Sequence, residues 1–149
     1  MRAVVQRVRE ARVTVAGEAV AEMGEGLLAL VGVARGDGPE DAAALAVKLA
    51  QLRVFEDAAG RMNRSLLETG GTLAVVSQFT LLGDARQGRR PSFAEAAPPE
   101  LAEPLVEAVA SGARTAGVSV ITGRFRARME LSLVNVGPVT LLLDTRRAF

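Results

Sequence analysis

Alternating apolar and polar residues at both ends of the chain limit its possible folds more than any other feature of the sequence. Near the start, VVQRV at 4–8 and RVTVAG at 12–17 place apolar side chains on one face of an extended segment. This alternation is typical of half-buried antiparallel strands. We expect strands at 3–8, 11–16, 19–23 and 27–33, and again in the closing segments VSVITGRF, MELSLVNV and PVTLLLD. The chain therefore predicts a sheet built from both of its ends.

Two helices are predicted between these strand regions. The first begins with Pro39, whose missing N–H is not needed in a first helical turn, and two acidic residues that suit the helix dipole follow it. Its apolar positions recur at helical spacing and end near Arg53. The second helix runs from about Pro98 towards Ala116, and Pro104 within it predicts either a kink or a later start.

The length of the chain supports one domain over 1–149, because 149 residues with 49% hydrophobic content can form a single compact core. The predicted fold is α+β, with a mostly antiparallel sheet or barrel and two principal helices. Apolar runs stay at strand length, well below the roughly 20 residues of a membrane-spanning helix, so we expect no membrane partner. The first residues lack the apolar stretch of a secretory signal, and we expect a cytoplasmic location.

The chain contains neither histidine nor cysteine, and this excludes several kinds of catalysis. A Ser-His-Asp triad, an imidazole base, a thiolate nucleophile and the zinc sites built from histidine or cysteine all need the missing residues. We expect no metal and no cofactor. If the protein is an enzyme, its chemistry comes from hydroxyl, amide, carboxylate or backbone groups, or from the substrate itself.

A polar interruption in an apolar strand is the first candidate site. The segment VVSQFTLLG at 75–83 places Ser77, Gln78 and Thr80 where hydrocarbon is expected. A buried polar group without a partner costs about 1–3 kcal/mol, so these residues need a reason to be there. Strand alternation separates Ser77 from Thr80, so both can serve one pocket only if the strand ends, bulges or twists between them. The alternative is that their hydroxyls bond nearby carbonyls and do nothing else.

Gly137 and Pro138 form the second candidate, because they fall between two alternating runs in LVNVGPVT at 133–140. Proline cannot donate a hydrogen bond to a sheet, so the pair predicts a strand end, a bulge or an edge. With a cis bond the pair would form a type VI turn that aims carbonyl oxygens outward as acceptors. A trans turn is the alternative, since cis bonds are uncommon before proline.

Four separated motifs together resemble the D-aminoacyl-tRNA deacylases, in the order found in that family. They are SQFTL at 77–81, RPSF at 90–93, GRFRARM at 123–129 and NVGPVT at 135–140. QRV at 6–8, GRMN at 60–63 and the overall length agree, so the resemblance covers essentially the whole chain. One position departs from the family pattern: the residue before Gly137 is often acidic there, and here it is Val136. A packing role for Val136 leaves the motif intact, whereas a role in orienting the turn would alter its geometry.

The resemblance implies hydrolysis of the ester bond of D-aminoacyl-tRNA by a homodimer with active sites at the subunit interface. In that family the Gly–cis-Pro pair of one subunit enters the pocket of the other. Carried over to this chain, Gly137 and Pro138 become the chirality filter that excludes L-residues, and Arg7 becomes the arginine that helps to hold their turn. An exposed surface charge is the alternative for Arg7. Because glycine has no side chain to exclude, glycyl-tRNA is expected to be a substrate as well.

The resemblance also assigns the pocket. Ser77, Gln78, Phe79 and Thr80 would receive the aminoacyl ester, while Phe125 and Met129 would lie near the terminal adenosine of the tRNA. Simple core packing is the alternative for Phe125 and Met129. An aminoacyl ester is already activated, so a placed water and donors for the developing oxyanion suffice, and one donor is worth about 3–4 kcal/mol. The backbone N–H groups of Phe79 and Thr80 are our candidates, with assistance from the ribose hydroxyl beside the ester. Thr80 as a covalent nucleophile is the competing mechanism, although the chain shows no base to activate it.

Several arginines are candidates for sequence-tolerant contacts to RNA phosphates, and solvated surface charge is the alternative for each. They are Arg86, Arg89 and Arg90 in the loop 83–93, together with Arg124 and Arg126. Two other function classes compete with the deacylase: an RNA-binding module without catalysis, and a hydrolase of small D-aminoacyl esters.

Overall fold

The computed structural model describes all of residues 1–149, and its sheet is organised around the first strand. Strand β1 (Arg2–Val15) pairs antiparallel with β8 (Met129–Asp144) along nearly its whole length. On its other side β1 pairs first with β3 (Gly26–Gly32) and then with β2 (Glu18–Met23), both antiparallel. A single strand therefore hydrogen-bonds to three others.

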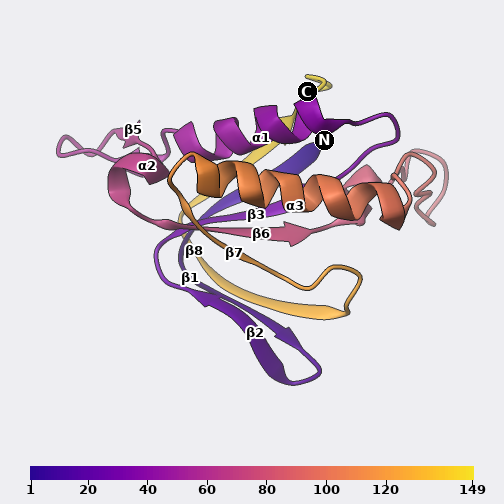
Figure 1. Cartoon of the computed structure of the whole chain (residues 1–149), viewed down its shortest axis with the longest axis horizontal. Coiled ribbons are helices and arrows are strands. Elements are labelled where there is room, and N and C mark those ends of the chain that lie inside the picture. The colour runs from indigo at the N-terminus through magenta and orange to yellow at the C-terminus, as the bar shows by residue number, and fades with distance from the viewer.

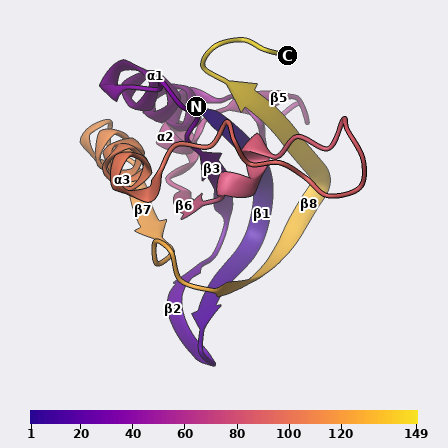
Figure 2. The same ribbon diagram turned by 90° about the vertical axis from the view of Figure 1, so that its right-hand side faces the viewer.

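The remaining strands join the sheet in parallel. Strand β6 (Thr72–Ser77) pairs with β3, and β7 (Ser119–Thr122) pairs with β6. Figure 2 shows β8 following the curve of β1, while β7 lies below α3 on the other side of the sheet. The six strands thus form a mixed sheet that is nearly closed as a barrel. The barrel stays open because β7 and β8 do not pair with each other. The predicted α+β class with a mostly antiparallel, barrel-like sheet is confirmed.

Two helices cover one face of the sheet, as Figure 1 shows. Helix α1 (Pro39–Gln51) and α3 (Pro99–Thr115) provide the crossovers that parallel strand pairs require. Their buried faces are built largely from alanine, leucine and valine, which lets the two helices pack closely over the strands. The core between helices and sheet is one cluster of 22 buried residues, and a second cluster of five buried residues is built from β1, β2, β3 and β6.

Three differences from the predicted elements have local physical causes. The segments 3–8 and 11–16 form the single strand β1, because its pairing with β8 shifts register at two irregularities and then resumes. The segments 129–136 and 138–144 are likewise one strand, β8. Helix α3 begins at Pro99 and continues through Pro104, so Pro104 does not delay its start.

Small elements fill the stretch that the sequence predicts as a polar loop. Strands β4 (Phe55–Glu56) and β5 (Met62–Arg64) form a short antiparallel hairpin, and the four-residue helix α2 (Leu66–Thr69) follows. No helix in the structure is long and apolar enough to cross a membrane.

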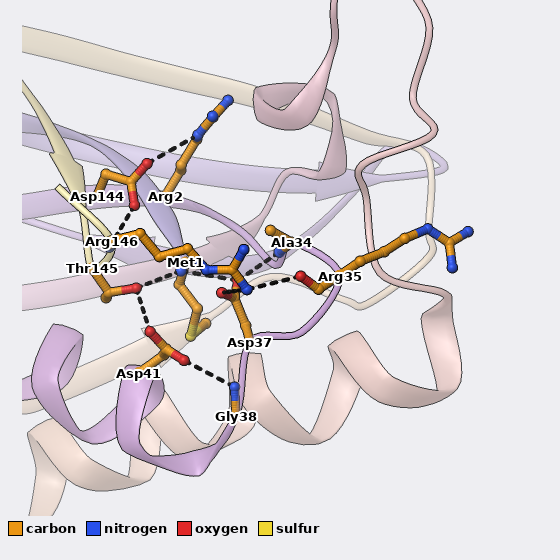
Figure 3. A network of polar contacts seen from close by, with 10 residues as sticks. All are labelled: Met1, Arg2, Ala34, Arg35, Asp37, Gly38, Asp41, Asp144, Thr145 and Arg146. Atoms are coloured by element: carbon orange, nitrogen blue, oxygen red, sulfur yellow. Dashed lines mark hydrogen bonds and ion pairs between the residues drawn. The ribbon is translucent and has the colours of Figure 1, made fainter. Parts of the chain in front are cut away.

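A buried ionic network joins the start of β1 to the end of β8 and to the approach to α1, as Figure 3 shows. The α-ammonium of Met1 lies 2.9 Å from a carboxylate oxygen of Asp37, and both groups are fully buried. The same ammonium donates to the hydroxyl of Thr145 at 2.6 Å, and that hydroxyl donates in turn to Asp41. The hydrogen bond from Thr145, followed by one from the backbone N–H of Gly38, holds the pKa of Asp41 below its ordinary value. The network therefore fixes the first residue of the chain to two other segments.

Replacing Asp37 by asparagine tests the importance of this network. The Asp37→Asn variant leaves the buried ammonium of Met1 facing a neutral amide, and losing one partner of a buried pair costs about 3–5 kcal/mol. We expect the free energy of unfolding to fall by about 3 kcal/mol in urea titrations followed by circular dichroism. The chain has neither tryptophan nor tyrosine, so fluorescence is a poor probe.

The matched control is Glu22→Gln, which removes a carboxylate from an ion pair with Arg12 whose side chains are 59% and 57% exposed. Such exposed pairs contribute less than about 1 kcal/mol. Equal losses in the two variants would show that the buried network has no special role.

Candidate active site

The polar segment of the sequence lies where β6 ends. Ser77 is the last residue of the strand, Gln78 follows it, and residues 79–82 form the short 3₁₀ helix η1 (Phe79–Leu82). The backbone N–H of Gln78 donates to the carbonyl of Val31 at 2.8 Å, which fixes the turn against β3. The strand therefore ends between Ser77 and Thr80, which is one of the conditions that the sequence sets for a shared site.

A cavity of about 610 Å³ opens beside this turn. Five of the predicted site residues line it: Ser77, Gln78 and Phe79 at the end of β6, Phe125 in the connection between β7 and β8, and Met129 at the start of β8. Most of the remaining lining is apolar and comes from β3, the loop before α3 and α3 itself. The cavity reaches the connection between β7 and β8, which do not pair with each other. It combines hydrocarbon walls with a few polar groups, as small-molecule sites generally do.

Phe79 stands at the rim of the cavity with 58% of its surface exposed. Its ring meets Phe93 edge to face, with ring centroids 5.1 Å apart. Phe93 also lines the cavity, and sequence reasoning did not give it a role although it ends the RPSF motif. Thr80 is not part of the lining; its hydroxyl accepts a hydrogen bond from the side-chain amide of Gln78. Thr80, which the sequence places in the pocket, therefore contacts a lining residue but does not itself line the cavity.

The Gly137–Pro138 segment bulges out of the sheet. Gln6 pairs with Thr140 and Val8 with Asn135, so the four residues 136–139 of β8 lie opposite the single residue Arg7 of β1. The Gly137–Pro138 peptide bond is cis, and both residues are exposed. Of the strand end, bulge or edge that the sequence leaves open here, the structure has the bulge.

Arg7 holds this bulge from below. Its side chain is almost entirely buried, with Nε donating to the carbonyl of Val136 at 3.0 Å and Nη1 donating to the carbonyl of Val54 at 2.8 Å. A Cβ on Gly137, whose φ is +129°, would come within 3.0 Å of Arg7 Nη2 and 2.8 Å of a Val139 methyl. Glycine is therefore required by both the backbone conformation and the space available.

Asn135 closes the other side of the turn, and the sequence gave no separate role to this residue. Its Oδ1 accepts from the N–H of Val139 at 2.8 Å, and its Nδ2 donates to the hydroxyl of Thr140 at 2.9 Å. The side chain thus replaces part of the ladder that the bulge interrupts. An amide side chain two residues before the glycine is the signal that could have indicated this clasp.

The cavity and the turn are separate within one chain. None of Arg7, Gly137 and Pro138 lines the cavity. The residues of the predicted site therefore fall into two groups, one concave and one projecting.

The candidate arginines differ in how free their charges are. Asp84 receives hydrogen bonds from Arg86 at 2.7 and 2.9 Å, which hold the pKa of Asp84 far below and raise that of Arg86 above their ordinary values. Arg86 is therefore neutralised locally, whereas Arg89 and Arg90 extend from the same loop without an ion-pair partner. Arg126 lines the cavity itself. Arg124 lines a neighbouring hollow beside three glutamates of α3.

Acidic residues do not gather in a way that suits a metal. No group of three or more Asp or Glu side chains lies close enough together to hold a metal ion.

Comparison with known proteins identifies the family of this chain. The family model described as D-Tyr-tRNA(Tyr) deacylase matches residues 4–144. The chain belongs to this family. It is 61% identical to a D-aminoacyl-tRNA deacylase of Anaeromyxobacter dehalogenans over the full length of both chains. It is 59% identical to a D-aminoacyl-tRNA deacylase of Roseiflexus sp., covering 97% of this chain and 94% of that protein.

Solved structures of two other proteins have the same fold. A c-Myc DNA unwinding element binding protein superimposes with a TM-score of 0.91 at 35% identity, covering 97% of this chain and 98% of that one. A probable eukaryotic D-amino acid tRNA deacylase superimposes with a TM-score of 0.81 at 19% identity, covering 96% and 98%. The resemblance that the four sequence motifs indicated is therefore confirmed at the level of family and fold.

Removing the guanidinium of Arg7 should weaken the fold as well as the turn. The Arg7→Met variant keeps the length of the side chain but leaves the carbonyls of Val54 and Val136 without their donor. An unsatisfied buried acceptor costs about 1–3 kcal/mol, so we expect the free energy of unfolding to fall by about 2 kcal/mol.

Urea titration measures this loss, and Arg9→Met on the same strand is the control. Arg9 is exposed and makes no side-chain hydrogen bond or ion pair, so its loss should change stability by less than about 0.5 kcal/mol. An Arg7→Met variant as stable as the Arg9→Met variant would contradict the buried role of Arg7.

Proposed function

We propose that this protein hydrolyses the ester bond of D-aminoacyl-tRNA and releases the free D-amino acid and tRNA. The observation that carries the proposal is the cavity at the end of β6, in which Ser77, Gln78 and Phe79 face Phe125 and Met129. Its volume of about 610 Å³ suits an aminoacyl group joined to one nucleoside. The names of the relatives at 61% and 59% identity support the same activity.

The proposed chemistry depends on backbone donors at the start of η1. The first N–H groups of a helical turn have no acceptor within that turn, so those of Phe79 and Thr80 are available to a ligand. In a pocket that excludes water, such donors can stabilise the oxyanion that develops when water attacks the ester. The ribose hydroxyl beside the ester assists proton transfer, which makes the RNA a part of the catalyst.

The terminal adenosine is proposed to lie between the apolar walls of the cavity. Phe125 and Met129 are both half-buried, so each can contact a bound base while remaining attached to the core. Aromatic and thioether side chains suit this contact because they offer a flat or polarizable apolar surface. This role for Phe125 and Met129 requires no sequence-specific contact.

Selection between the two hands of the amino acid is proposed to come from the turn of a second subunit. The turn is exposed and does not line the cavity of its own chain, and β8 also exposes Val136, Leu141 and Leu142. Exposed apolar side chains of this kind favour burial against another protein surface. A homodimer would allow Gly137 and Pro138 of each subunit to enter the other's cavity. Sedimentation that gives only a monomer would contradict this part of the proposal.

The turn can exclude L-residues without recognising D-residues. Arg7 and Asn135 hold the turn in place. Carbonyl oxygens of this fixed turn would bind the α-ammonium of the substrate, which leaves two directions for the hydrogen and the side chain on the α-carbon. The side chain of an L-residue would collide with main chain, and that of a D-residue would point to solvent. Specificity then rests on a steric penalty against the wrong substrate.

Hydrolysis of matched D-, L- and glycyl esters on one tRNA tests the proposal. Because a clash of about 3 kcal/mol corresponds to roughly a hundredfold in rate, we expect kcat/KM for the L-ester to be at least that much lower than for the D-ester. The glycyl ester should be hydrolysed at a rate comparable to the D-ester. Comparable cleavage of the L-ester would exclude the turn as a filter, and no cleavage of any ester would exclude the enzyme.

The role of Thr80 can be tested by separating its hydroxyl from its backbone. Thr80→Val removes the hydroxyl and keeps the N–H, while Thr80→Ser keeps both and serves as the control. If backbone donors and the substrate's own hydroxyl carry the reaction, kcat of the Val variant should remain within about tenfold of the Ser variant, far from the 10²–10³-fold loss of an oxyanion donor. A much larger loss, with an acyl-enzyme seen by mass spectrometry of the quenched wild type, would identify Thr80 as a nucleophile.

Two rival functions predict different outcomes in the same assays. An RNA-binding module would bind charged tRNA without hydrolysing it; the protein at 35% identity is named for binding a DNA element. A small-molecule hydrolase would cleave free D-aminoacyl esters as well as charged tRNA. We favour the deacylase and propose that it acts in the cytoplasm, with Arg89 and Arg90 contacting tRNA phosphates.

A further inference from the structure

Arg2 connects the end of β8 to the short helix η1. Its Nε donates to a carboxylate oxygen of Asp144 at 3.2 Å, and its Nη1 donates to the carbonyl oxygen of Leu81 at 3.2 Å. Leu81 belongs to η1, the short helix that also carries Phe79 and Thr80. The sequence separates Arg2 from Leu81 by 79 positions, and no motif points to this contact.

The position of Leu81 within η1 explains what the hydrogen bond does. The last carbonyl groups of a helical turn have no partner within it, and a cation at that end also interacts favourably with the helix dipole. The guanidinium of Arg2 therefore closes the C-terminal end of the turn. The N–H groups of Phe79 and Thr80 lie at the opposite end of η1. Because η1 has only four residues, fixing its C-terminal end also fixes the direction of these N–H groups.

Helix η1 packs directly against β3 beside the contact with Arg2. A Cβ on Gly32 would come within 2.6 Å of a Leu82 methyl and 2.9 Å of the carbonyl oxygen of Gln78. Gly32 pairs with Arg2 across the two strands, so the arginine extends beside the surface on which η1 sits. The close contact limits movement of η1 towards the sheet, and Arg2 limits its movement away from it.

The arginine itself is anchored at its base and at its head. The neighbouring Met1 is fixed by the buried pair with Asp37 and by a backbone hydrogen bond from Thr145, as Figure 3 shows for the side-chain contacts. Asp144, whose side chain is 4% exposed, also accepts from the N–H of Arg146 at 2.7 Å. The guanidinium is thus aimed by two fixed groups although the Arg2 side chain is 37% exposed.

We infer that Arg2 is a positioning residue that holds η1 so that the N–H groups of Phe79 and Thr80 face the bound ester. The inference rests on the proposed function for its effect on catalysis, but the contact between Arg2 and η1 can be measured without substrate. Misplacing catalytic groups by about 1 Å can cost about a hundredfold in rate. Arg2 should therefore act on kcat, while KM for charged tRNA depends on contacts elsewhere.

The test compares Arg2→Met with Arg12→Met. Arg12 is another arginine of β1, and its replacement breaks an exposed ion pair with Glu22. For D-aminoacyl-tRNA we expect Arg2→Met to lower kcat about ten- to a hundredfold with KM within about twofold, and Arg12→Met to change neither. Arg2→Lys keeps a donor near Leu81 and should recover part of kcat. Equal kcat in the wild type and Arg2→Met would overturn the inference.

Amide spectra keep the inference testable if the enzyme assay fails. In ¹H–¹⁵N spectra, Arg2→Met should shift the amide signals of residues 79–83 and speed their hydrogen exchange, whereas Arg12→Met should leave them unchanged. If Arg2→Met does not fold, Asp144→Asn releases the same guanidinium and should give the same pattern. Unchanged signals at 79–83 would overturn the positioning role, whereas a wild type that hydrolyses no ester would instead overturn the proposed function.

Discussion

The pairing of β1 is the constraint on which the rest of the structure depends. This strand hydrogen-bonds to β8, β3 and β2, so its position fixes most of the sheet. It also carries two arginines on opposite faces, because residues at even and odd positions alternate along a strand. Arg2 reaches η1 at the cavity, and Arg7 reaches the Gly137–Pro138 turn. One strand therefore sets the geometry of both groups of site residues.

The lack of histidine and cysteine agrees with a mechanism that relies on positioned main-chain groups. The proposed reaction needs donors that do not change protonation state, and backbone N–H groups meet that need at any pH at which the protein is folded. Such donors are effective only when they are fixed in advance, which is why the ends of η1 matter. The carbonyl groups of the turn need the same fixing, and Arg7 and Asn135 provide it from two sides. In the proposed mechanism, a rigid arrangement of main-chain groups takes the place of reactive side chains.

Sequence patterns found the long elements and missed the short ones for a common reason. Helices α1 and α3 and the strands repeat their apolar positions over many residues, so each gives a strong periodic signal. The β4–β5 hairpin, α2 and η1 are too short to repeat any pattern, and tertiary contacts stabilise them instead. The strand break predicted in β1 was wrong, because the chain continues in the same sheet past an irregularity in its pairing. At Gly137–Pro138 the sequence left a strand end, a bulge or an edge open, and the structure has the bulge.

The sequence by itself determined the residue types that the site can use and the motifs that contain them. Ser77, Gln78 and Phe79 are polar or aromatic where a strand should be apolar, and Gly137 with Pro138 interrupts an alternation; both signals are local. Only the tertiary structure decided which of them meet, since Phe125 joins the cavity while Gly137 and Pro138 project away from it. The contact of Arg2 with Leu81 and the buried partners of Arg7 likewise could not be predicted from the sequence. Their contacts join segments far apart in the chain or depend on the shape of a bulge, and no periodic pattern encodes either.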